Sequence, residues 1–349
     1  MENRDIYARL PGALLPWYEE NRRDLPWRKD KDPYHIWVSE IMLQQTRVEA
    51  VKGYYARFLQ VLPTVSDLAK ADDELLHKLW EGLGYYSRVR NLKKAAGQIM
   101  ERHGGVFPAG HAQVSDLAGI GPYTAGAVCS IAFNLPTPAV DGNVLRLISR
   151  LTDDDTPIDK PAYRKQITEN LASIYPDRAG DFTQALMELG ATICGPNRKP
   201  DCHLCPCKAF CLGYQNGTAE DLPVKKAKPQ RRQEDKTVFI LSCDGFYALR
   251  KRPDKGLLAG LWEFPNVTGK LDMKAAVSEV EKSGLKVKEV IRQVEKKHVF
   301  THVEWGMSGV YLEVKEKTGD YVWLSADQIS GQMALPTAFR QFWEEVDHV

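Results

Sequence analysis

The hydrophobic pattern of this 349-residue chain changes abruptly near residue 222. Before that point apolar residues recur at three- and four-residue spacing and strand-like alternation is nearly absent, which predicts an all-α domain over 1–222. A chain of this length can hold two domains, so the change of pattern marks a domain boundary. The predicted helices are Leu14–Asn21, Ile36–Leu62, Asp72–Trp80, Val89–His103, Tyr123–Phe133, Gly142–Leu151, Pro161–Tyr175 and Asp181–Cys194.

Residues 223–235 are predicted to link the two domains, because they combine two prolines and many charges with few apolar side chains. We expect a solvated tether, although its basic side chains could also contact a phosphate backbone. These basic residues are Lys225, Lys226, Lys228, Arg231 and Arg232.

Residues 236–349 have the pattern of a small α+β domain. Thr237–Ser242 and Phe246–Arg250 flank Asp244-Gly245, a dipeptide typical of a tight hairpin turn. A helix is predicted over Ala275–Ser283. Further strands are predicted over Trp305–Val314 and Tyr321–Leu324.

The composition excludes some classes of protein and leaves others open. With 43% hydrophobic and 27% charged residues, the chain is typical of a soluble globular protein. Its net charge of +1 neither predicts nor excludes a nucleic-acid partner. The first residues lack the apolar core of a signal peptide, and no apolar run approaches the roughly 20 residues of a membrane helix. We therefore expect a cytoplasmic protein with no membrane partner and with reduced cysteines.

Four of the seven cysteines, Cys194, Cys202, Cys205 and Cys211, lie in one short run directly after a predicted helix. Four thiolates can bind either a zinc ion or an iron–sulfur cluster, and the spacing alone leaves both open. The remaining three are expected to be ordinary small apolar residues. These are Cys129, Cys207 and Cys243.

The segment Leu117–Ala125 places Gly119 and Gly121 in a tight turn ahead of an apolar helix. Glycines allow the backbone to approach a partner closely, and the free N–H groups at a helix start favour an anion such as a DNA phosphate. From these residues alone, an ordinary corner between two helices is the preferred explanation of the pattern.

Two carboxylic acids stand out as candidates for cleavage of a glycosidic bond, which requires an acid and a negative charge near the sugar. Glu40 is embedded among apolar helical residues, where shielding would raise its pKa. Asp141 lies just before a predicted helix, whose N-terminus is expected to keep it ionised. Locally, most glutamates at such a position are solvent-facing helical residues, and Asp141 could equally be a simple N-cap.

Several of these motifs resemble known families. The cysteine run and Leu117–Ala125 resemble the cluster loop and helix-hairpin-helix motif of the endonuclease III superfamily of DNA glycosylases, although the first cysteine gap is one residue longer than usual and Ala118 replaces a proline. Leu25-Pro-Trp-Arg28, Ser39–Thr46 and Trp80–Tyr86 closely resemble adenine glycosylases of the MutY type. This resemblance implies a helical glycosylase domain, a 4Fe–4S cluster held by the four cysteines, and a monomer that acts on DNA in a bacterial-type nucleoid.

The resemblance also implies roles for individual residues. Glu40 would protonate the adenine and Asp141 would stabilise or capture the sugar cation, supported by Tyr123 and Asn143. Gln45 would wedge into the duplex opposite the extruded base. Trp27, Arg28 and Gln184 would line the adenine pocket, and Gly119, Gly121 and Thr124 would contact DNA.

Tyr123 occupies the position at which relatives that also cut the DNA strand carry a lysine for Schiff-base formation. We therefore expect a monofunctional glycosylase that uses water. The alternatives are a glycosylase/lyase for oxidised pyrimidines and a catalytically silent protein that binds mismatches. Intact Glu40 and Asp141 argue against the silent protein.

The C-terminal part resembles a Nudix, or MutT-like, domain at Gly256–Pro265, but the helix over Lys274–Ser283 lacks the acidic pattern that binds metal in Nudix hydrolases. A nucleotide pyrophosphatase is therefore disfavoured. The resemblance to the MutY family implies instead that the loop Phe300-Thr301-His302, in which threonine replaces the usual serine, recognises 8-oxoguanine. The implied substrate is double-stranded DNA with an 8-oxoguanine:adenine or guanine:adenine mispair.

Overall fold

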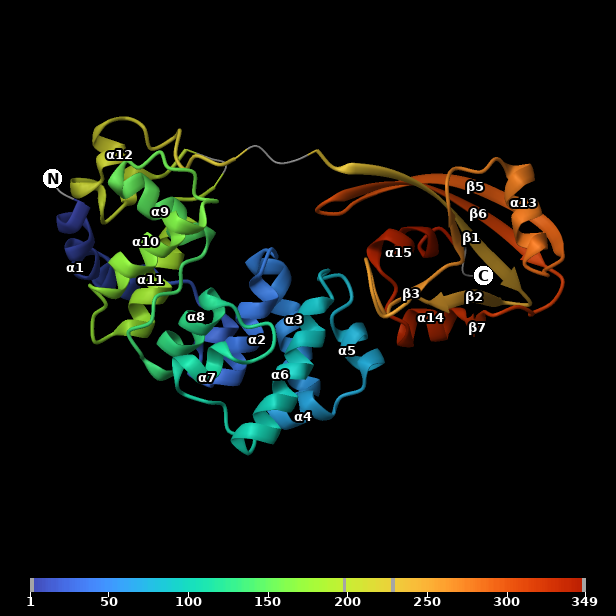
Figure 1. Cartoon of the computed structure of the whole chain (residues 1–349), viewed down its shortest axis with the longest axis horizontal. Helices are drawn as coiled ribbons and strands as arrows, with labels where there is room; N and C mark the ends of the chain where they lie inside the picture. Colours follow the sequence, from blue (N-terminus) through green and yellow to red (C-terminus); the bar gives the residue numbers. More distant parts are fainter. Residues whose placement is uncertain (1–2, 197–198, 227–229, 347–349) are drawn as a thin grey trace. The chain divides into compact units, whose positions relative to one another are not determined.

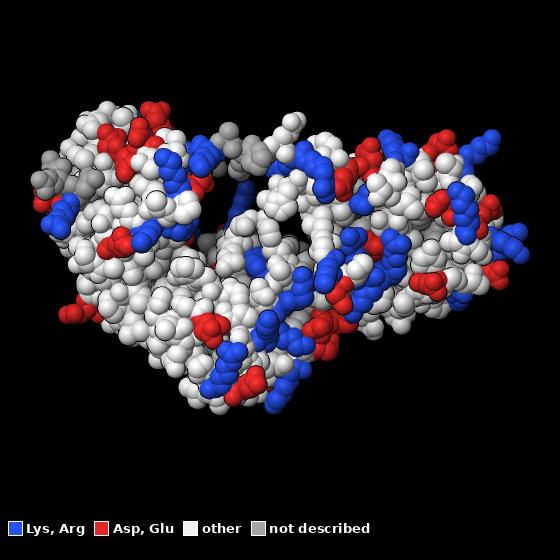
Figure 2. Space-filling view, viewed as in Figure 1, with Lys and Arg blue, Asp and Glu red and all other residues white. Residues whose placement is uncertain are grey.

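The computed structural model describes residues 3–196, 199–226 and 230–346 (Figure 1). Its contacts divide the chain into two compact units. The first comprises Met1–Lys70 and Asn91–Ala227, and the second Ala71–Arg90 and Lys228–Val349. Within the described ranges no helix combines the length and the apolar character needed to cross a membrane. Basic and acidic side chains intermingle on the face shown in Figure 2, in line with the small net charge.

The first unit is helical, as the periodicity predicts. Its elements are α1 (Asn3–Asn21), η1 (Pro26–Arg28), α2 (Pro33–Leu43), α3 (Val48–Val61), α4 (Val65–Lys70), most of α6 (Ser87–His103), α7 (His111–Ser115), α8 (Pro122–Phe133), α9 (Gly142–Thr152), α10 (Pro161–Ala172), α11 (Ala179–Thr192), η2 (Cys202–Leu204), η3 (Lys208–Phe210) and α12 (Leu212–Gln215).

The core beneath the site is formed where α1, α9, α10 and α11 pack together around fully buried side chains such as Leu10, Leu147 and Phe182. Close approach of α11 to α9 depends on Gly190, because a Cβ there would lie 2.8 Å from the Cβ of Asn143. This packing holds the start of α9, and therefore Asp141, in a fixed place.

The single helical pattern over Ile36–Leu62 is divided in the structure into α2 and α3. The break falls at Gln44–Arg47, where Gln45 has a φ of 59°. A left-handed backbone conformation is uncommon for a residue other than glycine, and such residues concentrate at functional sites. The apolar periodicity continues across the break, which is why the sequence alone did not reveal it.

The second unit is built around a seven-stranded sheet of order β3-β2-β1-β6-β5, with β4 paired to β1 and β7 to β2. Side chains of β1 alternate between two cores. Phe239 and Leu241 pack with α13, whereas Val238 and Ile240 pack with α15 on the other face. The elements are α5 (Asp73–Leu79), β1 (Arg232–Cys243), β2 (Phe246–Lys251), β3 (Trp262–Glu263), β4 (Asn266–Thr268), α13 (Met273–Lys282), β5 (Val287–Val299), β6 (Val303–Val314), β7 (Val322–Ser325), α14 (Ala326–Gln332) and α15 (Thr337–Trp343).

The predicted hairpin is present, with Asp244 and Gly245 at φ values of 50° and 76°. Strand β5 has no counterpart in the prediction, because it is an edge strand rich in charged residues that alternate weakly between half-buried and exposed.

Two features of the predicted domain organisation differ from the structure. Strand β1 begins at Arg232, inside the predicted linker, because residues 232–235 pair in parallel with β6. Ala71–Arg90 group with the second unit, where Lys78 Nζ donates to the carbonyl of Ser330 and Glu81 accepts from the backbone of Leu335. Such polar contacts join residues about 250 positions apart, so periodicity could not indicate them. Residues 227–229 of the linker lie outside the described part of the chain.

Candidate active site

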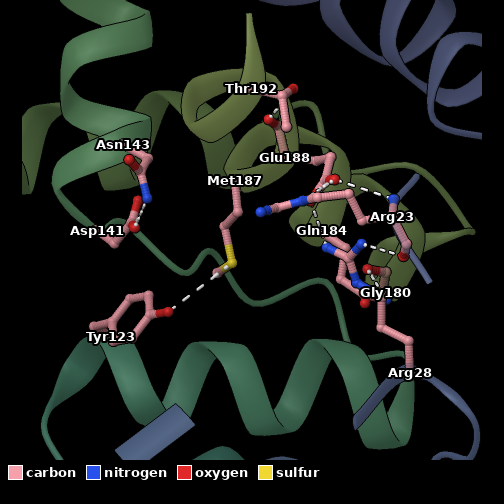
Figure 3. A network of polar contacts seen from close by, with 10 residues as sticks. All are labelled: Arg23, Arg28, Tyr123, Asp141, Asn143, Gly180, Gln184, Met187, Glu188 and Thr192. Atoms are coloured by element: carbon pink, nitrogen blue, oxygen red, sulfur yellow. Dashed lines mark hydrogen bonds and ion pairs between the residues drawn. The ribbon is translucent and has the colours of Figure 1, made fainter. Parts of the chain in front are cut away.

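A cavity of about 510 Å³ in the helical unit gathers most of the predicted site residues, and it is called the Glu40 cavity below. Its walls come from η1, α2, α8, α9 and α11, which are far apart in the sequence. Figure 3 shows residues from η1, α8, α9 and α11. The predicted residues that line it are Trp27, Arg28, Glu40, Gln45, Tyr123, Asp141, Asn143 and Gln184. Residues from separate sequence motifs therefore meet in one cavity.

Glu40 lies on α2 and is only 6% exposed. Tyr123 Oη donates a hydrogen bond to Glu40 Oε2 at 2.5 Å. Burial raises the pKa of the Glu40 carboxyl to about 7; the Tyr123 hydrogen bond opposes this shift, and the nearby Asp141 charge adds to it. A carboxyl group with a pKa near neutrality can donate a proton at physiological pH, as predicted for Glu40.

Asp141 is the N-cap of α9. Its Oδ1 accepts the backbone N–H of Val144 at 2.8 Å, and its Oδ2 accepts Asn143 Nδ2 at 2.7 Å. Burial raises the pKa of Asp141 and the N–H donors at the helix start lower it, with burial the larger effect, so the helix start opposes the shift without bringing the pKa below its usual value. The donors nevertheless favour the carboxylate, so the two acids of the cavity differ in what they hydrogen-bond to.

The support of Asp141 extends beyond Asn143 to the cysteine loop. Arg146 Nη2 donates to Asn143 Oδ1 at 2.9 Å, and Arg146 Nε donates to the backbone carbonyl of Cys194 at 2.8 Å. Arg150 Nη1 approaches the same carbonyl at 3.1 Å and Cys194 Sγ at 3.3 Å. Two buried arginines thus tie the first cysteine of the loop to the base of the site.

Glu188 is a residue of the cavity that sequence reasoning missed. Its side chain is fully buried and accepts Arg23 Nε at 2.6 Å, Arg23 Nη2 at 2.9 Å and Arg28 Nη2 at 2.8 Å (Figure 3). Burial by itself raises the pKa of Glu188, but the hydrogen bonds and charges of the two arginines together hold it below its usual value. The predicted pocket residue Arg28 is therefore fixed in orientation by a buried ion pair.

The other predicted pocket residues differ in exposure. Trp27 is buried, with its ring edge-to-face with Tyr55 at 5.5 Å. Gln184 donates a long hydrogen bond of 3.4 Å to the carbonyl of Gly180. Gln45 is exposed at the α2–α3 break described above, a position open to a DNA strand.

The predicted DNA-contacting turn precedes α8. Gly119 has a φ of +73°, and Gly121 is exposed at the N-cap of α8. Thr124 is only 2% exposed and its hydroxyl is 3.4 Å from Gln44 Nε2, so the structure does not support a DNA contact by this side chain. The local sequence did not reveal that Thr124 faces α2.

The two glycines of this turn should respond differently to alanine. A Cβ at Gly119 would lie 2.5 Å from Asn91 Cβ in a left-handed conformation, so Gly119→Ala should lower the free energy of unfolding by about 1–3 kcal/mol. A Cβ at Gly121 would meet nothing within 4 Å, so Gly121→Ala should leave stability nearly unchanged and weaken DNA binding. Urea unfolding and DNA-binding titrations measure both; equal stability losses would contradict the assignment.

The four predicted metal ligands Cys194, Cys202, Cys205 and Cys211 line a common cavity beside Arg150. Four thiolates about 2.3 Å from one zinc ion would converge on a point. Within residues 3–196, 199–226 and 230–346, no three His, Cys, Asp or Glu side chains converge in this way. The four thiols line one cavity, so these residues fit a group held by four thiolates. Cys207 packs in the core, as do Cys129 and Cys243 in theirs, in agreement with the prediction.

The loop Phe300-Thr301-His302 joins β5 to β6 in the second unit. Phe300 packs edge-to-face against His298 and Trp305, with ring centroids 4.5 and 4.7 Å away, and His302 is exposed. Thr301 Oγ1 lies 2.7 Å from the hydroxyl of Tyr85, which the sequence analysis did not single out. These loop residues and Tyr85 line a cavity of about 510 Å³ within this unit.

Comparisons with known proteins agree with this architecture. A family described as HhH-GPD superfamily base excision DNA repair protein matches residues 38–173, and a NUDIX domain matches residues 237–345. The solved structure of a thermostable thymine-DNA glycosylase matches with a TM-score of 0.54 and 30% identity, over 61% of this chain and 97% of that one.

Two curated relatives cover both units. An adenine DNA glycosylase from Arabidopsis thaliana is 38% identical over an alignment of 358 positions, which covers 86% of this chain and 56% of that protein. An adenine DNA glycosylase from Rattus norvegicus is 36% identical over an alignment of 352 positions, which covers 83% of this chain and 68% of that protein. The chain thus spans little more than half of the plant relative and about two thirds of the rat one. On this similarity, the chain belongs to the adenine DNA glycosylase family of the helix-hairpin-helix base-excision repair proteins.

Proposed function

We propose that this chain removes adenine that lies opposite 8-oxoguanine or guanine in double-stranded DNA, by flipping the adenine into the Glu40 cavity and hydrolysing its bond to deoxyribose. The observation that carries the proposal is the combination, in one cavity, of a buried carboxyl with a pKa of about 7 and a second carboxyl held by N–H donors. Flipping costs a few kcal/mol and is cheapest for a mispaired base.

In this mechanism the two carboxyl groups act on opposite ends of the same bond. Glu40 gives its proton to a ring nitrogen of adenine while the bonding electron pair leaves with the base. Positive charge then develops on the sugar, where the Asp141 carboxylate stabilises it before water adds. Tyr123 orients Glu40 through their hydrogen bond, and Asn143 orients Asp141.

The reaction is proposed to stop at the abasic sugar. A lyase step requires an amine that forms a Schiff base with the sugar. The described residues that line the Glu40 cavity include arginines but no lysine, and Tyr123 occupies the position next to Glu40. Water is therefore the nucleophile that this cavity allows.

A 4Fe–4S cluster is proposed as the occupant of the cavity among Cys194, Cys202, Cys205 and Cys211. The four cysteines line one cavity, which supports a group held by four thiolates, and when bound the cluster would brace the loop 194–211 by four iron–sulfur bonds. Arg150, close to Cys194 Sγ, would offset part of the negative charge of the thiolates. The Cys194 carbonyl in turn holds Arg146, so an ordered loop supports Asn143 and Asp141.

Recognition of the opposite base is assigned to the cavity at Phe300-Thr301-His302. The loop offers an aromatic ring, a hydroxyl and an exposed imidazole, which can stack with and hydrogen-bond to an oxidised guanine. The chain is proposed to act as a monomer.

Single-turnover release of adenine tests the proposal. Duplexes with adenine opposite 8-oxoguanine, guanine or thymine are incubated with the native chain, and abasic sites are revealed with alkali; one sample of each omits alkali. We expect fastest cleavage opposite 8-oxoguanine and intact strands without alkali. No adenine release from cluster-loaded protein would contradict the proposal, and strand cleavage without alkali would support the pyrimidine-type glycosylase/lyase.

The rate of excision should fall as the pH rises through about 7. The acid form of Glu40 is reactive, and its pKa is raised to about 7, so the protonated fraction drops about tenfold for each pH unit above that value. Because the Tyr123 hydrogen bond lowers this pKa, Tyr123→Phe should move the midpoint upward. Single-turnover rates between pH 5 and 9 measure both; a midpoint unmoved in Tyr123→Phe would argue against Glu40 as the titrating group.

A further inference from the structure

A second cavity of about 270 Å³ adjoins the Glu40 cavity in the helical unit, and it is called the Tyr18 cavity below. The two cavities have four lining residues in common, which form a wall between them. These are Trp27, Arg28, Ile131 and Gln184. Arg28 donates to Glu188 at 2.8 Å, whereas the hydrogen bond that Gln184 donates to the carbonyl of Gly180 is long, at 3.4 Å. The side chain of Gln184 is therefore held less tightly than that of Arg28 at this wall.

Tyr18 gives this cavity an unused hydrogen-bonding group. The residue is 1% exposed, and its hydroxyl has no hydrogen-bond partner within the described part of the chain. A buried hydroxyl without a partner costs about 1–3 kcal/mol, so its presence beside a cavity indicates that a ligand or water can complete it. The guanidinium groups of Arg22 and Arg28 lie over the Tyr18 ring, at 5.9 and 5.5 Å from its centroid.

The chemistry of the lining favours a flat neutral heterocycle over an anion. Much of the positive charge is already neutralised, because Arg28 pairs with Glu188 and Arg178 pairs with Asp181. The rings of Tyr18 and Trp27 offer apolar contact, and the Tyr18 hydroxyl can donate to a ring nitrogen. The volume is slightly below the range of sites for drug-sized ligands and suits one base better than a nucleotide.

We propose that the Tyr18 cavity receives the excised adenine, so that the free base leaves through the wall at Gln184 while the abasic strand still covers the entrance of the Glu40 cavity. This inference rests on adenine excision as the function of the Glu40 cavity. It explains why a second cavity with an unpartnered hydroxyl adjoins the reaction site, and it makes release of the base independent of release of the DNA.

Release kinetics test the path. The holoprotein cleaves a duplex with radiolabelled adenine in a single turnover, and rapid filtration separates free label from protein–DNA complex. We expect label to leave the native complex before the abasic strand. Lys31→Trp, at the exposed rim of the Tyr18 cavity, should slow the label severalfold without changing the cleavage rate. Lys29→Trp makes the same change at an exposed position outside the cavity lining and should behave as the native chain.

Equilibrium binding tests whether the Tyr18 hydroxyl contributes to the affinity for adenine. Dialysis of labelled adenine against protein bound to a duplex with an uncleavable abasic analogue should show affinity reduced about two- to tenfold in Tyr18→Phe, as expected for one lost hydrogen bond. The variant should unfold at the same or higher temperature, because the removed hydroxyl has no partner to lose. Displacement of adenine by inorganic phosphate would identify an anion site and overturn the inference.

Two further outcomes separate this inference from the function on which it rests. Cleavage by the native chain with base and strand leaving at one common rate, in Lys31→Trp as well, would overturn the release path alone. No cleavage by the native chain would contradict the proposed function itself.

Discussion

Replacement of Glu40 by glutamine is expected to lower the single-turnover rate of adenine excision by about 10²–10⁴-fold, the usual contribution of general acid catalysis. Glutamine keeps the size of the side chain and can still accept the Tyr123 hydrogen bond, but it has no proton to give to the base. Burial already favours the neutral form of Glu40, so the neutral amide should be tolerated. The change should therefore appear in the rate and leave the unfolding temperature nearly unaltered.

The matched control is Glu49→Gln on α3. The Glu49 side chain is 78% exposed and forms a surface ion pair with Lys52. This change should leave both rate and stability at the native level, since exposed ion pairs contribute about 0–1 kcal/mol. DNA affinity should be retained in both variants. A Glu40→Gln protein that excises adenine at the native rate would remove Glu40 from the role of acid and redirect attention to a water molecule in the cavity.

The helical framework of the site was predictable because buried helices leave a regular trace in the sequence. Helices α8, α9 and α11 begin and end within two residues of the predicted ranges. The break between α2 and α3 left no such trace, because the apolar pattern runs through it. Strand β5 was also missed, since an edge strand with charged residues lacks the alternation of buried strands.

The site was predictable where a residue belongs to a motif and unpredictable where its role depends on distant partners. Glu40 and Asp141 lie in short motifs that carried them into the prediction. Glu188 instead sits in an ordinary amphipathic helix, and its partners Arg23 and Arg28 are 165 and 160 residues away in the sequence. A buried ion pair between residues so far apart forms only in the folded chain, so the local sequence around Glu188 does not indicate it.

The electrostatics of Asp141 show the same limit. Its position before α9 correctly indicated an N-cap, with Val144 as donor. The pKa depends also on how deeply the group is buried, and burial outweighs the donors. The donors fix the orientation of the carboxylate. Asn143 donates to Asp141, and Arg146 in turn donates to Asn143. In the proposed reaction, this cap would therefore direct a negative charge at the sugar as well as begin a helix.

Asp141→Asn is accordingly expected to lower the excision rate by about 10²–10³-fold, as for other losses of an aimed electrostatic group, with little loss of stability. Asparagine caps helices as well as aspartate, but its amide has no negative charge for the sugar and cannot accept from both Val144 and Asn143 at once. Single-turnover rates and urea unfolding measure the two effects. Asp272→Asn, the same change at the exposed N-cap of α13, should alter neither. A native rate in Asp141→Asn, or an equal loss in both variants, would show that this carboxylate serves the helix and leave the sugar cation to be stabilised elsewhere.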